Sequence, residues 1–420
     1  MTRRTWATLA ALTLLPLPVM ATEKADVLVN YADIAVATYG DSLSTAETLK
    51  QAVETLISDP SEAHLLAART AYLAARVPYM QTEVFRFGNA IVDDWEGRVN
   101  AWPLDEGLID YVDASYGGAG DENDYASLNV IATPKFDLAG KTVDASIITP
   151  ALLSDTLQEA DGVEANVATG YHAIEFLLWG QDLHGTGPGA GERPWTDYAK
   201  GDLCTGGNCD RRAAYLQAAT TALVTDLGWM VGQWQADGAA RQTLLADQTA
   251  GIRAILTGMG SLSYGEMAGQ RIKLGLMLND PEEEHDCFSD DTANSHFHDV
   301  LGIRNVYLGS YESADGRVTK GASLADMVKA ADPAADAELR GKLDASVTAA
   351  QALVAAGKDG VAYDMMLAPG NKAGKALIMT LVDNLVSQTK SIERAVGVLG
   401  LDAVAFEGSD SLDNPDAVFQ

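Results

Sequence analysis

The fold can be inferred from one stretch, Gly170-Tyr171-His172-Ala173-Ile174-Glu175-Phe176-Leu177-Leu178-Trp179-Gly180. Apolar residues recur at helical spacing within it and before it, which predicts a helix from about Glu164 to Trp179 that ends at Gly180. His172 and Glu175 share one face of such a helix, where an imidazole and a carboxylate can hold one cation. The pair alone is a weak signal, because His/Glu pairs at this offset also occur as surface contacts or hydrogen-bonded core histidines.

The same helical periodicity continues through most of the 420-residue chain, so we predict an all-α fold. Asp59-Pro60 should end the first helix, Ser61 should cap the second, and Pro78 should bend it. Thr149-Pro150 should begin another helix. The other predicted helices are Lys24 to Ser58, Ser61 to Gly88, Arg211 to Gln235, Ala240 to Leu256, Ser261 to Leu278, Asp291 to Leu308, Leu324 to Ala331, Ala335 to Ala356 and Lys372 to Val398.

A glycine-rich connection from Gln181 to Asp210 separates two sets of long helices and is the best candidate for a domain junction. We therefore predict two four-helix bundles packed against each other, covering residues 22–205 and 206–420. The span from Asn89 to Ile148 is expected to be largely irregular, and the acidic tail from Glu407 is expected to be loose.

Residues 1–21 are predicted to be a signal peptide. Arg3 and Arg4 precede an apolar run, and the small-residue sequence Val19-Met20-Ala21 follows it. The run is too short for a membrane-spanning helix, and no later segment approaches the required length. No cysteine near the cleavage site could accept a lipid, so we expect a soluble exported protein.

The formal net charge of −30 disfavours nucleic acid and anionic membrane surfaces as partners and favours cations. Much of this acidity has the simpler role of keeping an exported protein soluble.

Three cysteines are present, and two of them, Cys204 and Cys209, bracket a flexible Thr-Gly-Gly-Asn segment. In an oxidising compartment they could form a disulfide, which leaves Cys287 as the odd one. A zinc site on the same pair is a weaker alternative, because the spacing is long for a metal pair.

Two further clusters have the residue types of a metal centre. Arg76, Glu83 and Arg86 share one face of the second helix; Glu83 could be a ligand that Arg86 positions, or the group could be an ordinary salt bridge. Glu282 and His285 form a second carboxylate/imidazole pair if their segment is helical.

The second cluster also has a simpler interpretation. The run Glu282-Glu283-Glu284 could be an acidic helix start, and Ser289, Asp290, Asp291 and Thr292 have the residue types of helix caps. His296 and His298 lie two apart on roughly opposite sides of a helix, so we expect both at the surface.

No catalytic residue is predicted. The chain has no nucleophile elbow, phosphate-binding loop or dinucleotide fingerprint. A zinc peptidase helix would carry His-Glu-x-x-His, whereas here Ala173 follows the histidine and leaves no general base between the ligands.

The Gly-x-His-x-x-Glu motif at residues 170–175 resembles the hallmark of the imelysin-like family, and the likeness covers most of the chain after the leader. The other stretches that resemble the family's iron-regulated branch are Arg76 to Tyr79, Glu83 to Gly88, Trp102 to Asp105, Cys204 to Arg212 and Glu282 to Asp290.

The resemblance implies two related helical bundles with a functional site between them, and a periplasmic role in bacterial iron acquisition. It identifies His172 and Glu175 as motif residues, with Glu83, Arg86, Asp105, Glu283 and His285 around them. We take His172, Glu175, Glu83 and His285 as candidate metal ligands. The candidate supporting residues are Arg76, Arg86, Asp105, Glu283, Ser289 and Asp290.

Three hypotheses follow. The first is a non-enzymatic protein that binds iron or an iron-containing small ligand between the bundles, although the same donors accept zinc or copper. The second is a zinc-dependent metallopeptidase using His172 and Glu175, a class in which this family was once placed. The third is a metal-free adaptor that contacts envelope proteins of an iron-uptake assembly.

Overall fold

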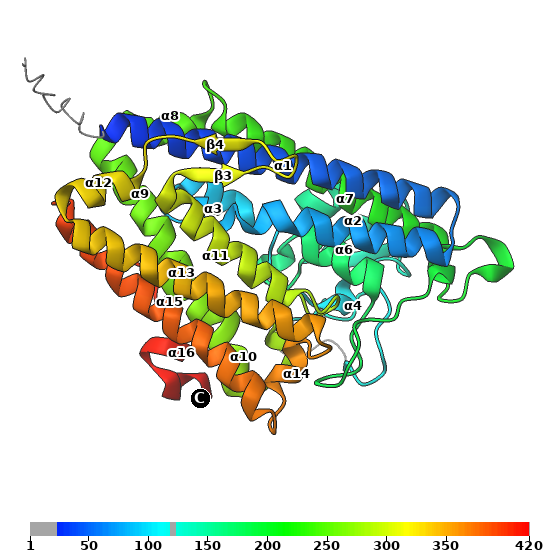
Figure 1. Ribbon diagram of the computed structural model, residues 1–420. Coiled ribbons are helices and arrows are strands. Elements are labelled where there is room, and N and C mark those ends of the chain that lie inside the picture. The colour runs from blue at the N-terminus through cyan, green and yellow to red at the C-terminus, as the bar shows by residue number, and fades with distance from the viewer. Residues whose placement is uncertain (1–22, 118–122, 420) are drawn as a thin grey trace, which may run out of the picture.

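The computed structural model describes residues 23–117 and 123–419 (Figure 1). The predicted signal peptide, residues 1–21, lies outside them. The regular secondary structure of these residues is helical apart from two short antiparallel hairpins, which confirms the all-α prediction. The hairpins pair β1 (Lys135–Leu138) with β2 (Lys141–Asp144) and β3 (Ser310–Glu312) with β4 (Val318–Lys320). Within these residues, none of the helices combines the length and the apolar character needed to cross a bilayer.

The longer helices are α1 (Lys24–Ser58), α2 (Glu62–Met80), α6 (Gly170–Trp179), α7 (Cys209–Trp234), α9 (Gln248–Ser261), α11 (Thr292–Leu308), α13 (Pro333–Lys358) and α15 (Lys372–Val398). The shorter ones are α3 (Ala90–Glu96), α4 (Glu106–Ile109), α5 (Pro150–Leu152), α8 (Ala239–Ala246), α10 (Leu274–Leu278), α12 (Leu324–Ala331), α14 (Tyr363–Leu367) and α16 (Asp410–Asp413). Two π-helical segments, Leu153–Leu157 and Leu262–Lys273, and several 3₁₀ turns join them.

The helices form two packed groups. α1 packs along α2 and α7, and α6 packs against α2 and α7. In the second group, α15 packs along α13 and the π-helix Leu262–Lys273, and α13 also packs along α11 (Figure 1). The groups meet where α11 contacts α2 and where α9 contacts α1. The division of the chain after residue 205 stays a prediction; the helix that follows it, α7, packs along α1.

Tertiary contacts move the start of α6 to Gly170 from the predicted Glu164. Gly170 has a φ of +81°, and a Cβ there would lie 2.5 Å from the Val99 carbonyl oxygen, so only glycine fits this close approach. The Tyr171 amide donates to that same carbonyl, at 2.7 Å. The helix therefore begins where the chain crosses Val99, and Gly180 ends it as predicted.

The second helix ends earlier than predicted. α2 stops at Met80, and a 3₁₀ turn from Glu83 to Phe85 replaces the expected helix up to Gly88. Pro78 lies in the last turn of α2, where it cannot donate a backbone hydrogen bond. Ser61 caps the helix as predicted, since its side chain accepts from the His64 amide.

The prediction that the tail from Glu407 is loose is wrong. The Glu407 amide donates to the Ser261 hydroxyl at 3.1 Å, and the buried Ser411 hydroxyl donates to the Gly269 carbonyl at 2.9 Å. A Cβ on Gly269 would lie 2.2 Å from the Ser409 Cβ, so this glycine makes room for the tail. The acidic tail thus covers the π-helix Leu262–Lys273.

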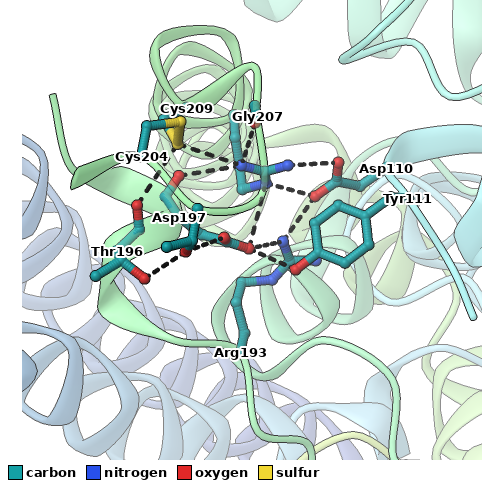
Figure 2. The surroundings of a disulfide bond; sticks show 10 residues. Asp110, Tyr111, Arg193, Thr196, Asp197, Cys204, Gly207 and Cys209 are labelled. Carbon is teal, nitrogen blue, oxygen red and sulfur yellow. Dashed lines mark hydrogen bonds and ion pairs between the residues drawn. A yellow bond between two sulfur atoms is a disulfide. The ribbon is translucent and has the colours of Figure 1, made fainter. Parts of the chain in front are cut away.

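Cys204 and Cys209 form a disulfide beside a buried network of charged groups (Figure 2). Arg212 on α7 donates to both oxygens of Asp110, at 2.6 and 2.9 Å. Arg193 donates to the same carboxylate at 2.7 Å and to Asp197 at 3.0 Å. Two guanidinium groups and two carboxylates thus balance their charges and attach the 181–210 connection to α7.

We expect Asp110→Asn to lower the free energy of unfolding by about 3–5 kcal/mol, because it leaves Arg193 and Arg212 with one buried carboxylate between them. Urea unfolding followed by circular dichroism measures the change. The matched control is Asp344→Asn, which breaks the exposed pair with Arg304 and should cost no more than about 1 kcal/mol. Equal losses in the two variants would contradict a structural role for the buried network.

Candidate metal centre

α6 carries the motif pair into the interior. His172 is 1% exposed and Glu175 is 0% exposed, and His172 Nδ1 lies 3.2 Å from Glu175 Oε2. The Tyr72 hydroxyl of α2 donates to Oε2 at 3.2 Å, and Ser289 donates to Oε1 through its amide at 3.0 Å and its hydroxyl at 2.6 Å. Glu175 is therefore held by hydrogen bonds from α2 and from the segment that precedes α11.

The segment before α11 brings a second imidazole and a third acid to α6. The His285 ring centroid lies 4.6 Å from that of His172. Asp286 Oδ1 lies 2.8 Å from Arg76 Nη2, and both side chains are buried. Arg76 also donates to the Asn100 side chain at 2.6 Å. The site thus lies where α2, α6 and the 284–291 segment meet.

Three of these side chains can reach one ion. One ligand atom each from His172, Glu175 and Asp286 lies within 4.8 Å of the others. His172 Nδ1 faces Glu175, whereas its Nε2 is buried and has no hydrogen-bond partner among the described residues. An imidazole nitrogen and two carboxylate oxygens this close together have the donor types and spacing expected of a cation site.

The protonation states suit ligation by the histidines. Burial lowers the pKa of His172 to about 3, and the Arg76 cation adds to the effect. Burial also lowers the pKa of His285 well below its ordinary value. Both imidazoles are therefore neutral near pH 7, and a neutral ring nitrogen is the form that binds metal.

The carboxyl groups of Glu175 and Asp286 have pKa values shifted in opposite directions. Burial raises the pKa of Glu175 to about 8, and the nearby Asp286 carboxylate adds to the rise. Burial acts the same way on Asp286, but the Arg76 guanidinium and His285 hold the pKa of Asp286 well below its usual range. Asp286 is the permanent anion of the site, and an arriving cation would displace a proton from Glu175.

Two predicted residues lie in a different cluster. Glu83 Oε2 accepts from Arg271 at 2.7 Å, so its negative charge is already paired. Arg86 lies within ion-pair distance of Asp93, Glu96 and Glu266. The structure does not bring Glu83 into the group of ligand atoms around His172.

Asp105 and Glu283 line a cavity of about 420 Å³ next to the centre. The wall residue Trp102 has its ring centroid 5.9 Å from that of His285. Asp105 accepts from Tyr116 at 3.1 Å and from Asn123. Burial raises the pKa of Glu282, another wall residue, to about 7, and the Glu106 carboxylate adds to the rise. Five acidic residues line this space: Asp105, Glu106, Asp182, Glu282 and Glu283.

Sequence reasoning missed Asp286 and Tyr72. Asp286 follows His285 directly within an acidic run, but nothing local distinguishes it from the acids around it.

The prediction that His296 and His298 lie at the surface is wrong. His296 is 0% exposed and its ring packs against Tyr363, with centroids 5.4 Å apart, while His298 is half-buried. Their helix, α11, packs along α13 of the second helical group and contacts α2 of the first, so more than one of its faces is covered.

The comparisons with known proteins agree with this fold. The sequence profile of the imelysin family matches residues 35–392, so the chain belongs to that family. A stretch of 72 residues is 38% identical to Iron-regulated protein A of Synechococcus elongatus and covers 17% of this chain and 20% of that relative. The match thus spans about a fifth of the relative's length.

A crystal structure from Parabacteroides distasonis, of a protein provisionally described as an iron-regulated protein A precursor, superposes with a TM-score of 0.65. The two chains are 18% identical, and the match covers 92% of this chain and 98% of that one. At this identity the likeness concerns the fold alone.

The raised pKa of Glu175 predicts a pH effect on the metal-free protein. Between the unfolded pKa near 4.3 and the folded value of about 8, the folded state binds more protons at this residue, so its contribution to stability falls as pH rises. Glu175→Gln removes this contribution. We expect the free energy of unfolding of the variant, relative to the unsubstituted protein, to increase from pH 5 to pH 8 in chelator-treated samples.

The control for this experiment is Glu47→Gln, at an exposed position of α1. Its urea-unfolding stability should follow that of the unsubstituted protein at every pH. Parallel curves for Glu175→Gln as well would show that Glu175 has no raised pKa in the folded protein.

Proposed function

We propose that this member of the imelysin family is a periplasmic protein that binds iron, or an iron-containing small ligand, at the His172 cluster and contributes to iron uptake. The observation that supports this most directly is the buried cluster in which one ligand atom each from His172, Glu175 and Asp286 lies within 4.8 Å of the others.

The donor set agrees with a transition metal. One neutral imidazole and two carboxylates are ligands that iron accepts, as do zinc and copper. Three protein ligands leave coordination positions for water or for a group of a small ligand. His285, whose ring lies against that of His172, is the nearest further imidazole and would bind or position such a group.

The charges around the centre favour cations. The cavity beside His285 is lined by five acidic residues and, among the described residues, by no lysine or arginine. With a net charge of −30, the whole chain adds to this attraction. The acidic cavity is our proposed route for a cation to the buried ligands.

The preference for iron comes from the name of a relative. The Synechococcus protein that shares a 72-residue stretch is called Iron-regulated protein A, which links that relative to iron supply. Peptide hydrolysis is the weaker proposal, because the residue after His172 is Ala173 and supplies no general base.

Metal analysis tests the proposal. We expect the unsubstituted protein, loaded with Fe²⁺ without oxygen or with Zn²⁺ and then desalted, to retain about one ion per chain, and His172→Ala/Glu175→Ala to retain almost none. Inductively coupled plasma mass spectrometry measures the content. The control is His184→Ala, at an exposed histidine whose Nδ1 lies 2.9 Å from Asp182. Equal metal content in the unsubstituted protein and the double variant would end the proposal.

The hydroxyl of Ser289 should tune the affinity without being a ligand. It holds Glu175 Oε1 at 2.6 Å, and removing a group that orients a ligand typically costs 10–100-fold in affinity. We expect Ser289→Ala to weaken Zn²⁺ binding about tenfold in competition with a chromophoric chelator. An unchanged affinity would mean that Glu175 is not a ligand or does not need this support.

A further inference from the structure

A second group of acids combines residues of the 284–291 segment with one residue of α14. One carboxylate oxygen each from Glu284, Asp290 and Asp364 lies within 4.8 Å of the others. Glu284 and Asp364 are each 1% exposed, and Asp290 is partly buried. Asp364 comes from α14, so two segments distant in sequence converge here.

These oxygens lack the partners that buried carboxylates normally have. Both oxygens of Asp364, together with Glu284 Oε2 and Asp290 Oδ1, are buried and have no hydrogen-bond partner among the described residues. Within the same residues, no ion pair joins any of the three acids to an arginine or lysine. The group therefore concentrates negative charge without a protein cation to balance it.

The lack of a balancing cation agrees with the raised pKa of a carboxyl group in this cluster. Burial raises the pKa of Asp364 to about 7, although nearby backbone amides reduce the shift. Without a cation, three neighbouring acids can avoid mutual repulsion only by holding protons.

We propose that Glu284, Asp290 and Asp364 form a second cation site, for a hard divalent ion of the calcium type, separate from the His172 centre. The donors are all oxygen, which suits calcium, magnesium or manganese and contrasts with the imidazole-containing centre. Calcium–oxygen distances of about 2.4 Å allow two ligands of one ion to be up to about 4.8 Å apart, and these oxygens all lie within 4.8 Å of one another, so one ion can reach all three.

The surroundings leave room for the remaining ligands. Calcium takes about 6–8 oxygens, so three carboxylates must be completed by water. A cavity of about 410 Å³ borders one member of the group, Asp290, and Lys358 and Met365 also line it. It gives water and an ion a path as far as Asp290.

The two sites share one segment. His285, Asp286 and Ser289 reach the His172 centre, while Glu284 and Asp290 belong to the carboxylate group. A cation bound by the carboxylate group would fix both ends of the stretch that carries Asp286. The second site thus has a structural role in addition to any binding of its own.

Calcium titration of the chelator-stripped chain tests this proposal, with CaCl₂ alone as the probe and calorimetry as the readout. We expect the unsubstituted protein to bind one Ca²⁺, Asp364→Asn to bind it at least tenfold more weakly, and His172→Ala/Glu175→Ala to bind it as the unsubstituted protein does. The matched control is Asp359→Asn, which removes an exposed charge nearby and should change nothing. Calcium should also raise the melting temperature of the control but not of Asp364→Asn.

Three results would overturn the proposal. The first is no calcium binding at millimolar concentration, and the second is a calcium affinity that Asp364→Asn does not reduce. The third is calcium binding lost in His172→Ala/Glu175→Ala and retained in Asp364→Asn, which would place the ion at the first centre. Circular dichroism checks the fold of each variant, and Asp290→Asn replaces Asp364→Asn if the latter is unfolded.

Discussion

The ion pair between Arg76 and Asp286 is the contact on which the arrangement of the metal centre depends. Arg76 belongs to α2 in the first helical group, and Asp286 precedes α11, which packs in the second. Both side chains are buried, so removing either leaves an uncompensated charge at a cost of about 3–5 kcal/mol. The pair holds the 284–291 segment against α2, and from there Ser289 reaches Glu175 and the His285 ring contacts His172, both on α6.

Arginine partners divide the buried acids into two kinds. Asp110 is bound by Arg193 and Arg212, and Glu83 is bound by Arg271. These carboxylates are neutralised by the protein and tie segments together. Glu175 and the group of Glu284, Asp290 and Asp364 have no such ion pair to arginine among the described residues, and burial keeps the pKa of Glu175 and Glu284 high. Asp286 combines the two roles, because it is paired with Arg76 and also lies within reach of an ion held by His172 and Glu175.

Helix positions were predictable from the sequence where local signals decide them. α12 and α15 cover the predicted residues because caps and apolar periodicity lie within the helices and beside their ends. The predictions for the start of α6, the end of α2 and the tail were wrong. The start of α6 depends on the Val99 carbonyl, and the tail is held by Ser261 and Gly269, all distant in sequence. Local periodicity contains no information about such contacts.

By itself, the sequence determined the helical class, the family and the chemistry of one helix face, because the offset between His172 and Glu175 follows from helix geometry alone. Ser289 and His285 were also among the site residues predicted from the sequence. Only the tertiary structure decided that Asp286 joins His172 and Glu175, and that Glu83 forms an ion pair with Arg271 instead. The physical reason is that ion pairing and desolvation depend on distances between segments far apart in the chain, and burial then sets the protonation state of each group.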